Sequence, residues 1–108
     1  MEPIKYTPIT GTTTDVYTTP LDWDVAGITD KMIRLKNTDA TNSLKYQLLS
    51  KVSYDTGMEK TEVAETTLAP GEIADFAAYK ALGRMKVQVK AAAAGSQATF
   101  QIDYGGKM

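Results

Sequence analysis

The stretch RMKVQVKAAAAGSQATFQIDY, residues 84–104, decides the fold class of this chain. It contains two runs in which apolar and polar residues alternate without a break. The apolar positions are Met85, Val87, Val89 and Ala91 in the first run, and Ala98, Phe100, Ile102 and Tyr104 in the second. Strict alternation predicts strands with one buried and one solvated face, which is typical of antiparallel sheets. The segment AGS at 94–96 predicts a turn between the two strands.

Further β signals extend toward the N-terminus. Residues 21–25, 32–37 and 44–54 alternate in the same way, and TDVYTT at 14–19 is rich in β-branched and aromatic side chains. Leu49 interrupts the alternation of its run, which indicates either a bulge or a second buried face. Turn-forming clusters separate the runs about every ten residues. The chain is therefore predicted to be all-β, as a sandwich or a barrel.

The stretch TTLAPGEIADF, residues 66–76, joins two of the extended runs. Pro70 is preset for the first central position of a turn, and Gly71 can adopt the positive φ that a type II turn requires next. Leu68 before the turn, and Ile73 or Phe76 after it, can then enter the same core. We interpret this stretch as a corner that takes the chain from one sheet to the other.

Composition argues against several classes of function. With 12 basic and 13 acidic residues the formal net charge is −1, so no long-range field steers the chain toward nucleic acid or an anionic membrane. The chain has no cysteine and no histidine. These absences remove disulfides, a thiolate nucleophile and the commonest general base. We expect no enzymatic activity and no cofactor.

Length and the character of the N-terminus give the expected domain organisation. A chain of 108 residues is one domain by ordinary size. Residues 1–13 contain Pro3 and Pro8 and are predicted to form an extended N-terminal arm before a single β-sandwich domain, residues 14–108. The N-terminus has no apolar core of a signal peptide, and no apolar run approaches the roughly 20 residues that span a bilayer. Folding in a cytoplasm is expected.

Several of these segments, taken together, resemble a known kind of module. IRLKNTD at 33–39, TLAPGEIADF at 67–76 and the two runs that follow look like small immunoglobulin-like β-sandwich modules, which often carry an L-x-P-G-E corner. With the lead-in WDVAGITDKMIRLKN, the order is also similar to small structural proteins of tailed bacteriophages, which decorate or complete the head or another part of the virion. The resemblance covers about residues 21–104.

The resemblance implies an immunoglobulin-like antiparallel sandwich of about seven or eight strands, with a jelly roll as the alternative topology. It also implies a non-enzymatic virion protein, assembled in the host cytoplasm. Its expected partners are other copies of itself and virion proteins such as a major capsid protein, without nucleic acid or membrane. The competing function is a carbohydrate- or host-surface-binding module, which would use loops at one end of the sandwich and an exposed aromatic platform.

The N-terminal arm is the predicted assembly interface. Ile4, Tyr6 and Ile9 are apolar residues on a segment interrupted by proline. Such an arm can dock on a neighbouring molecule by pairing its backbone with an open sheet edge. The alternative is that the arm folds back on its own sandwich.

Two further groups each have a functional and a structural interpretation. Trp23, between Asp22 and Asp24, could stack on a sugar ring, but it shares a strand face with apolar neighbours and is predicted to belong to the core. The loop containing Asn37, Asp39 and Asn42 offers oxygen ligands suited to calcium. Its single carboxylate and its composition favour an ordinary turn.

Paired carboxylates raise the question of a glycosidase, which needs two of them in a cleft. The candidates are Asp22 with Asp24, Glu59 with Glu62, and Glu62 with Glu65. We interpret the glutamates as charges on an exposed edge strand, where they discourage stray sheet pairing.

Overall fold

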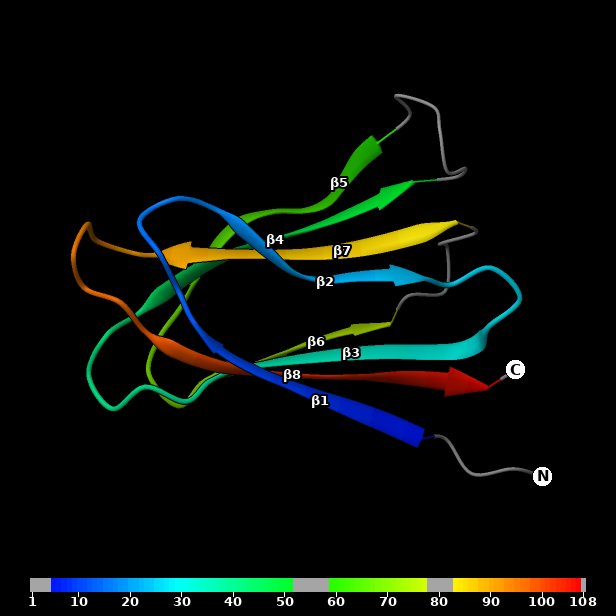
Figure 1. The fold of residues 1–108 in the computed structure, drawn as a ribbon, viewed down its shortest axis with the longest axis horizontal. Coiled ribbons are helices and arrows are strands. Elements are labelled where there is room, and N and C mark those ends of the chain that lie inside the picture. The colour runs from blue at the N-terminus through cyan, green and yellow to red at the C-terminus, as the bar shows by residue number, and fades with distance from the viewer. Residues whose placement is uncertain (1–4, 52–58, 78–82, 108) are drawn as a thin grey trace.

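The structure, a computed structural model, describes residues 5–51, 59–77 and 83–107. This part of the chain forms eight strands in two four-stranded antiparallel sheets, packed face to face (Figure 1). The strands are β1 (Lys5–Thr12), β2 (Thr18–Asp24), β3 (Thr29–Asn37), β4 (Leu44–Lys51), β5 (Glu59–Leu68), β6 (Ile73–Ala77), β7 (Arg84–Ala91) and β8 (Thr99–Lys107). The predicted all-β antiparallel sandwich is confirmed, at the upper strand number.

The strand order is that of a jelly roll. One sheet, called sheet A, has the order β1-β8-β3-β6, and the other, sheet B, has the order β2-β7-β4-β5. The first strand thus pairs with the last, the second with the seventh, the third with the sixth and the fourth with the fifth, as in a long hairpin rolled into two layers. An immunoglobulin sandwich instead pairs several consecutive strands. Among the described strands only β4 and β5 do so, so the topology is the predicted alternative and the immunoglobulin-like order is wrong.

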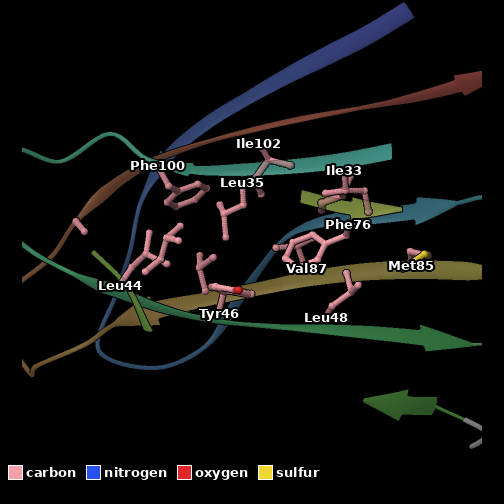
Figure 2. Packing of buried hydrophobic residues seen from close by; sticks show 14 of the residues in the cluster. Ile33, Leu35, Leu44, Tyr46, Leu48, Phe76, Met85, Val87, Phe100 and Ile102 are labelled. Atoms are coloured by element: carbon pink, nitrogen blue, oxygen red, sulfur yellow. The ribbon is translucent and has the colours of Figure 1, made fainter. Parts of the chain in front are cut away.

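The core lies between the two sheets and uses the faces that the alternation predicted. Ile33, Leu35 and Ile102 of sheet A and Val87 and Val89 of sheet B are fully buried. Figure 2 shows side chains from both sheets pointing into this layer, with the rings of Tyr46 and Phe76 5.5 Å apart between centroids. Burial alternates strictly along β7, which confirms the face assigned from the sequence.

Leu49 lies on a second buried surface, and the bulges are in the neighbouring strand. The register of β4 with β7 is continuous, so Leu48 and Leu49 point to opposite faces. Leu48 enters the core, whereas Leu49 is buried on the outer face, opposite Lys86 of β7. The register of β4 with β5 shifts on both sides of Leu48, where β5 carries extra residues.

The predicted corner is present as a type II turn. The N–H of Glu72 donates to the carbonyl of Ala69 at 3.0 Å, and Gly71 has φ of 80°. Leu68 and Phe76 enter the core as predicted, but Ile73 lies on the outer face of β6 with 52% of its surface exposed. The turn connects sheet B to sheet A.

Two predictions for the N-terminal third differ from the structure. Residues 14–19, predicted as a strand, contain the loop from β1 to β2, and β2 begins only at Thr18. The cause is a long-range contact: the Asp15 carboxylate accepts hydrogen bonds from the N–H of Gly95 at 2.8 Å and from Gln97 Nε2 at 2.6 Å, which holds this segment against the β7–β8 loop. Residues 5–12 of the predicted arm form β1, an edge strand paired along its whole length with β8.

Candidate functional site

The described part of the predicted arm interface lies against the chain's own sandwich. Ile9 pairs with Ile102 of β8 and packs, half-buried, against the core. The backbone of Tyr6 pairs with Gly105, and Ile4 lies outside the described residues. Within this single chain the described part of the arm therefore adopts the second of the two arrangements considered. No other described strand pairs with the outer side of β1.

Trp23 belongs to the core layer rather than to an exposed platform. Its ring is half-buried, and it meets the ring of Tyr104 of β8 edge-on, with 5.0 Å between centroids. The flanking carboxylates point outward: Asp22 accepts a hydrogen bond from Arg84 Nε at 2.7 Å, and Asp24 accepts one from the N–H of Ala26 at 3.1 Å. Both carboxylates are therefore engaged in hydrogen bonds within the chain.

The predicted Asn37 loop is held together by its own hydrogen bonds. Asn37 is fully buried, and its Nδ2 donates to the carbonyls of Asn42 at 2.9 Å and Leu68 at 3.0 Å. Its Oδ1 accepts from the N–H of Asp39 at 2.9 Å. Asn42 in turn donates to the carbonyl of Gln97. These oxygens and amides therefore serve the turn, which was the favoured interpretation.

Asp39 is the electrostatic centre of this loop. Its carboxylate accepts hydrogen bonds from the N–H groups of Asn42 at 2.8 Å, Thr41 at 3.1 Å and Thr99 at 3.3 Å. The bonds from Asn42 and Thr41 stabilise the charged form, so they lower the pKa of Asp39 below its usual value. Asp15 has a lowered pKa for the same kind of reason, chiefly its bond from the N–H of Gly95. Two carboxylates thus bind together the loops at one end of the sandwich, on the left in Figure 1.

The glutamates of β5 lie on an edge strand, as predicted, and each has a partner. Glu59 pairs with Lys86 at 3.0 Å, and Glu62 accepts from the Ser50 hydroxyl at 2.7 Å. Glu65 lies on the outer face of sheet B, where its partners come from three segments. This arrangement does not place two carboxylates on either side of a cleft.

The structure contains a polar cluster centred on Glu65 that the sequence did not predict. The carboxylate lies 2.5 Å from the Tyr17 hydroxyl, 3.3 Å from Lys90 Nζ and 3.7 Å from Lys45 Nζ. Lys90 Nζ also lies over the Tyr17 ring, 4.8 Å from its centroid. The Tyr17 hydrogen bond and Lys90 lower the pKa of Glu65, whereas burial and then the Glu65 carboxylate raise the pKa of Tyr17. The pairing of β4 with β5 and β7 brings Glu65, Lys45 and Lys90 together, and the β1–β2 loop adds Tyr17, so no sequence motif predicts this cluster.

The described residues contain no group of three or more acidic, histidine or cysteine side chains placed to hold a metal ion. Nor does this part of the chain include a helix that is long and apolar enough to cross a membrane.

Comparison with known proteins shows similarity at the level of the fold. No family model matches the chain, and no curated protein matches its sequence. Among solved structures, it is similar to a mitogen derived from Yersinia pseudotuberculosis, with a TM-score of 0.64 and 11% identity over 94% of this chain and 86% of that one.

Two other solved structures are similar over most of their length. A protein from a structure of Bacillus endospore appendages, described as disulfide-linked pili, has a TM-score of 0.59 and 14% identity over 97% of this chain and 87% of that one. A de novo designed double-stranded β-helix has a TM-score of 0.51 and 12% identity over 93% of this chain and 97% of that one. At these identities the likeness shows a shared β-sandwich fold.

Proposed function

We propose that this chain is a non-enzymatic structural protein of a virus particle, a phage capsid decoration protein or another head-associated component. The resemblance of WDVAGITDKMIRLKN and TLAPGEIADF to small phage structural proteins supports this proposal. The jelly-roll order is compatible with it, because this topology is common in viral capsid proteins as well as in lectins. Structural neighbours that include a pilus protein are consistent with a fold suited to assembly.

The proposal that the chain is not an enzyme rests on the hydrogen-bond and ion-pair partners of its carboxylates. Asp15 and Asp39 accept backbone hydrogen bonds that hold the loops together, and Glu65 accepts from a tyrosine and two lysines. Asp22 and Asp75 pair with Arg84 and Arg34. The pKa values of Asp15, Asp39 and Glu65 are all lowered, which favours permanent charge and is the opposite of what a general acid needs.

Such a protein acts through many weak contacts made at once. Each copy contributes a modest interface with the repeating surface of a particle. Copies joined in one assembly bind such a surface with an avidity about 10² to 10⁴ times the affinity of a single copy. The required features are a rigid module and accessible surfaces. The two-layer sandwich with its tightly bonded loop end supplies the first.

The carbohydrate-binding alternative depends on an exposed aromatic platform. Trp23 does not supply one, because its ring is half-buried against Tyr104 and the core. Tyr17 lies beside Glu65, but Lys90 covers part of its ring.

The test is a measurement of copy number in particles. Phage particles from the host that carries this gene are banded twice in a density gradient, and the peptides of this chain are quantified by mass spectrometry against the most abundant particle protein. We expect many copies per particle, well above the level of an abundant host protein, which is the control for carry-over. Particles that contain this chain only at the level of the carry-over control would overturn the proposal, and a glycan array would then test the alternative.

A further inference from the structure

Among the described strands, four have one side without a partner strand: β1 and β6 in sheet A, and β2 and β5 in sheet B. Open edges are potential pairing sites, and proteins protect them with proline, charge, bulges or short length. Edge β5 is protected by Glu59, Lys60, Glu62 and Glu65 and by two shifts of register. Edge β2 contains Pro20, and its register shifts between Thr18 and Leu21. Both edges of sheet B are therefore protected.

The edge of β6 is short and has one charged side chain, Asp75, which is paired with Arg34 of the neighbouring strand β3 at 2.6 Å. Its register with β3 is continuous over all five pairs, and it contains no proline. The N–H of Asn37 donates to the carbonyl of Glu72, and hydrogen-bonded pairs alternate along an antiparallel ladder. The N–H and C=O groups of Ile73, Asp75 and Ala77 therefore point away from β3, to the open side. Ile73 adds an apolar side chain with 52% of its surface exposed, beside this free backbone.

The open side of β1 has a complementary character. The N–H of Thr13 donates to the carbonyl of Ala98, and the same alternation then directs the free groups of Pro8, Thr10 and Thr12 away from β8. The side chains of these three residues are exposed and uncharged. Pro8, near the middle of β1, lacks an N–H, so of these three residues only Thr10 and Thr12 can donate to a partner strand.

We propose that the β6 edge of one molecule binds the β1 edge of a second copy, so that sheet A continues from molecule to molecule. This proposal rests on the proposed function as an assembling structural protein and names the contact surface. The four strands of sheet A alternate in direction, so β1 and β6 run oppositely. A second copy placed beside the first with its strands in the same orientation therefore presents its β1 antiparallel to β6, and the alternation continues across the junction.

Charge favours this pairing over the symmetric one. Two β6 edges paired about a two-fold axis in full register would bring Asp75 opposite its own copy, and directly opposed like charges destabilise a sheet. In the β6–β1 pairing Asp75 faces a threonine instead. The register that pairs all three outward-bonding residues of each strand places Thr12 opposite Ile73, Thr10 opposite Asp75 and Pro8 opposite Ala77.

A β6–β1 contact uses two different surfaces, so it is heterologous. Heterologous contacts produce closed rings when the rotation between copies closes, and open filaments when it does not. Either assembly would present the same outer face of sheet A or sheet B in every copy, which suits binding to a repeating surface.

The test uses disulfide trapping in a chain that has no natural cysteine. Residues opposite each other in a hydrogen-bonded antiparallel pair have Cα atoms about 5.5 Å apart, within disulfide range. We expect a mixture of the Thr12→Cys and Ile73→Cys variants to form a disulfide dimer of twice 11.7 kDa under mild oxidation. Either variant alone should form at least tenfold less disulfide dimer than the mixture. The matched control is Val16→Cys mixed with Ile73→Cys, because Val16 is also exposed, at 69%, but lies in a loop.

Two outcomes would overturn the proposal. Cross-linking of Ile73→Cys with itself, as efficient as in the mixture, would show that β6 pairs with β6. A mixture that cross-links no more than the Val16 control, together with a mass of 11.7 kDa by light scattering for the unmodified chain, would show that this edge is unused. Neither outcome bears on whether the chain is present in particles, which the copy-number measurement decides separately.

A second pair of variants tests the same contact without oxidation. Ile73→Lys places a charge at the open edge, which is how proteins protect such edges. We expect it to convert the assembly to a species of 11.7 kDa, while Val16→Lys keeps the mass of the unmodified chain. Equal masses for the two variants, both above that of one chain, would contradict the proposed edge.

Discussion

Replacing Asn37 with alanine removes the side chain that connects three segments of the loop end. The carboxamide is fully buried, donates to the carbonyls of Leu68 and Asn42, and accepts from the N–H of Asp39. The bond to Leu68 is buried, whereas the other two are partly accessible to water. A buried group left without its partner costs about 1–3 kcal/mol, and each accessible bond contributes about 0.5–1 kcal/mol. We therefore expect Asn37→Ala to lower the free energy of unfolding by about 3 kcal/mol.

This loss is large against the roughly 5–15 kcal/mol that stabilises an ordinary domain. It should be measured by urea unfolding, followed by the fluorescence of Trp23, the only tryptophan. The midpoint should fall while the slope with denaturant stays constant, because the same surface is exposed on unfolding. In a thermal scan the same change corresponds to a fall in Tm of about 12 °C.

The matched control is Asn42→Ala, which removes the same atoms from a half-buried position in the same loop. Its side chain donates to the carbonyl of Gln97 at 2.8 Å, a partly accessible bond. We expect a loss of about 1 kcal/mol. If Asn37→Ala costs no more than Asn42→Ala, the reasoning from burial and bond number is refuted.

Three further variants or conditions test other parts of the structure. Gly11→Ala should lower the free energy of unfolding in urea by about 1–3 kcal/mol, because a Cβ at Gly11 would lie 2.8 Å from Cζ of the Phe100 ring. Its control is Thr12→Ala, at an exposed position of the same strand, which should change stability little. Leu48→Gln should cost about 3 kcal/mol or more and Leu49→Gln less than half of that, because Leu48 faces the core and Leu49 the outer face; equal losses would contradict the assigned faces. The pKa values of Asp15, Asp39 and Glu65 are lowered in the folded chain. The stability that these carboxylates contribute is therefore fully present above their pKa values in the unfolded chain, near 4, and is lost as the pH falls through their pKa values in the folded chain. The urea midpoint should therefore fall as the pH is lowered from 6 to 2, and it should fall less steeply in Asp39→Asn. A midpoint that rises as the pH is lowered would contradict the assigned roles of these carboxylates.

Local patterns in the sequence determined the strand faces and one turn. The alternation in 84–91 and 98–104 predicts which side chains of β7 and β8 are buried, because side-chain direction in a strand follows from the backbone alone. Pro70 and Gly71 predict a type II turn because their own allowed φ values match it. The edge position of the charged β5 segment was also readable.

The same local patterns misassigned residues 14–19 and could not locate the polar cluster around Glu65. The β propensity of TDVYTT is outweighed by hydrogen bonds from Gly95 and Gln97 to Asp15, which are residues far along the chain. Glu65, Tyr17 and Lys90 meet only because β4 pairs with both β5 and β7 in sheet B, and because the β1–β2 loop that carries Tyr17 contacts these strands.

The tertiary structure alone decided the order of strands. Period-2 alternation is identical in an immunoglobulin-like sandwich and a jelly roll, since it reports which face of a strand is buried but not which strand lies beside it. The pairing of β1 with β8 joins residues from opposite ends of the chain, such as Ile9 and Ile102. The sequence thus determined the class of fold and its faces. Long-range pairing determined which edges stay open, and with them the surface proposed for assembly.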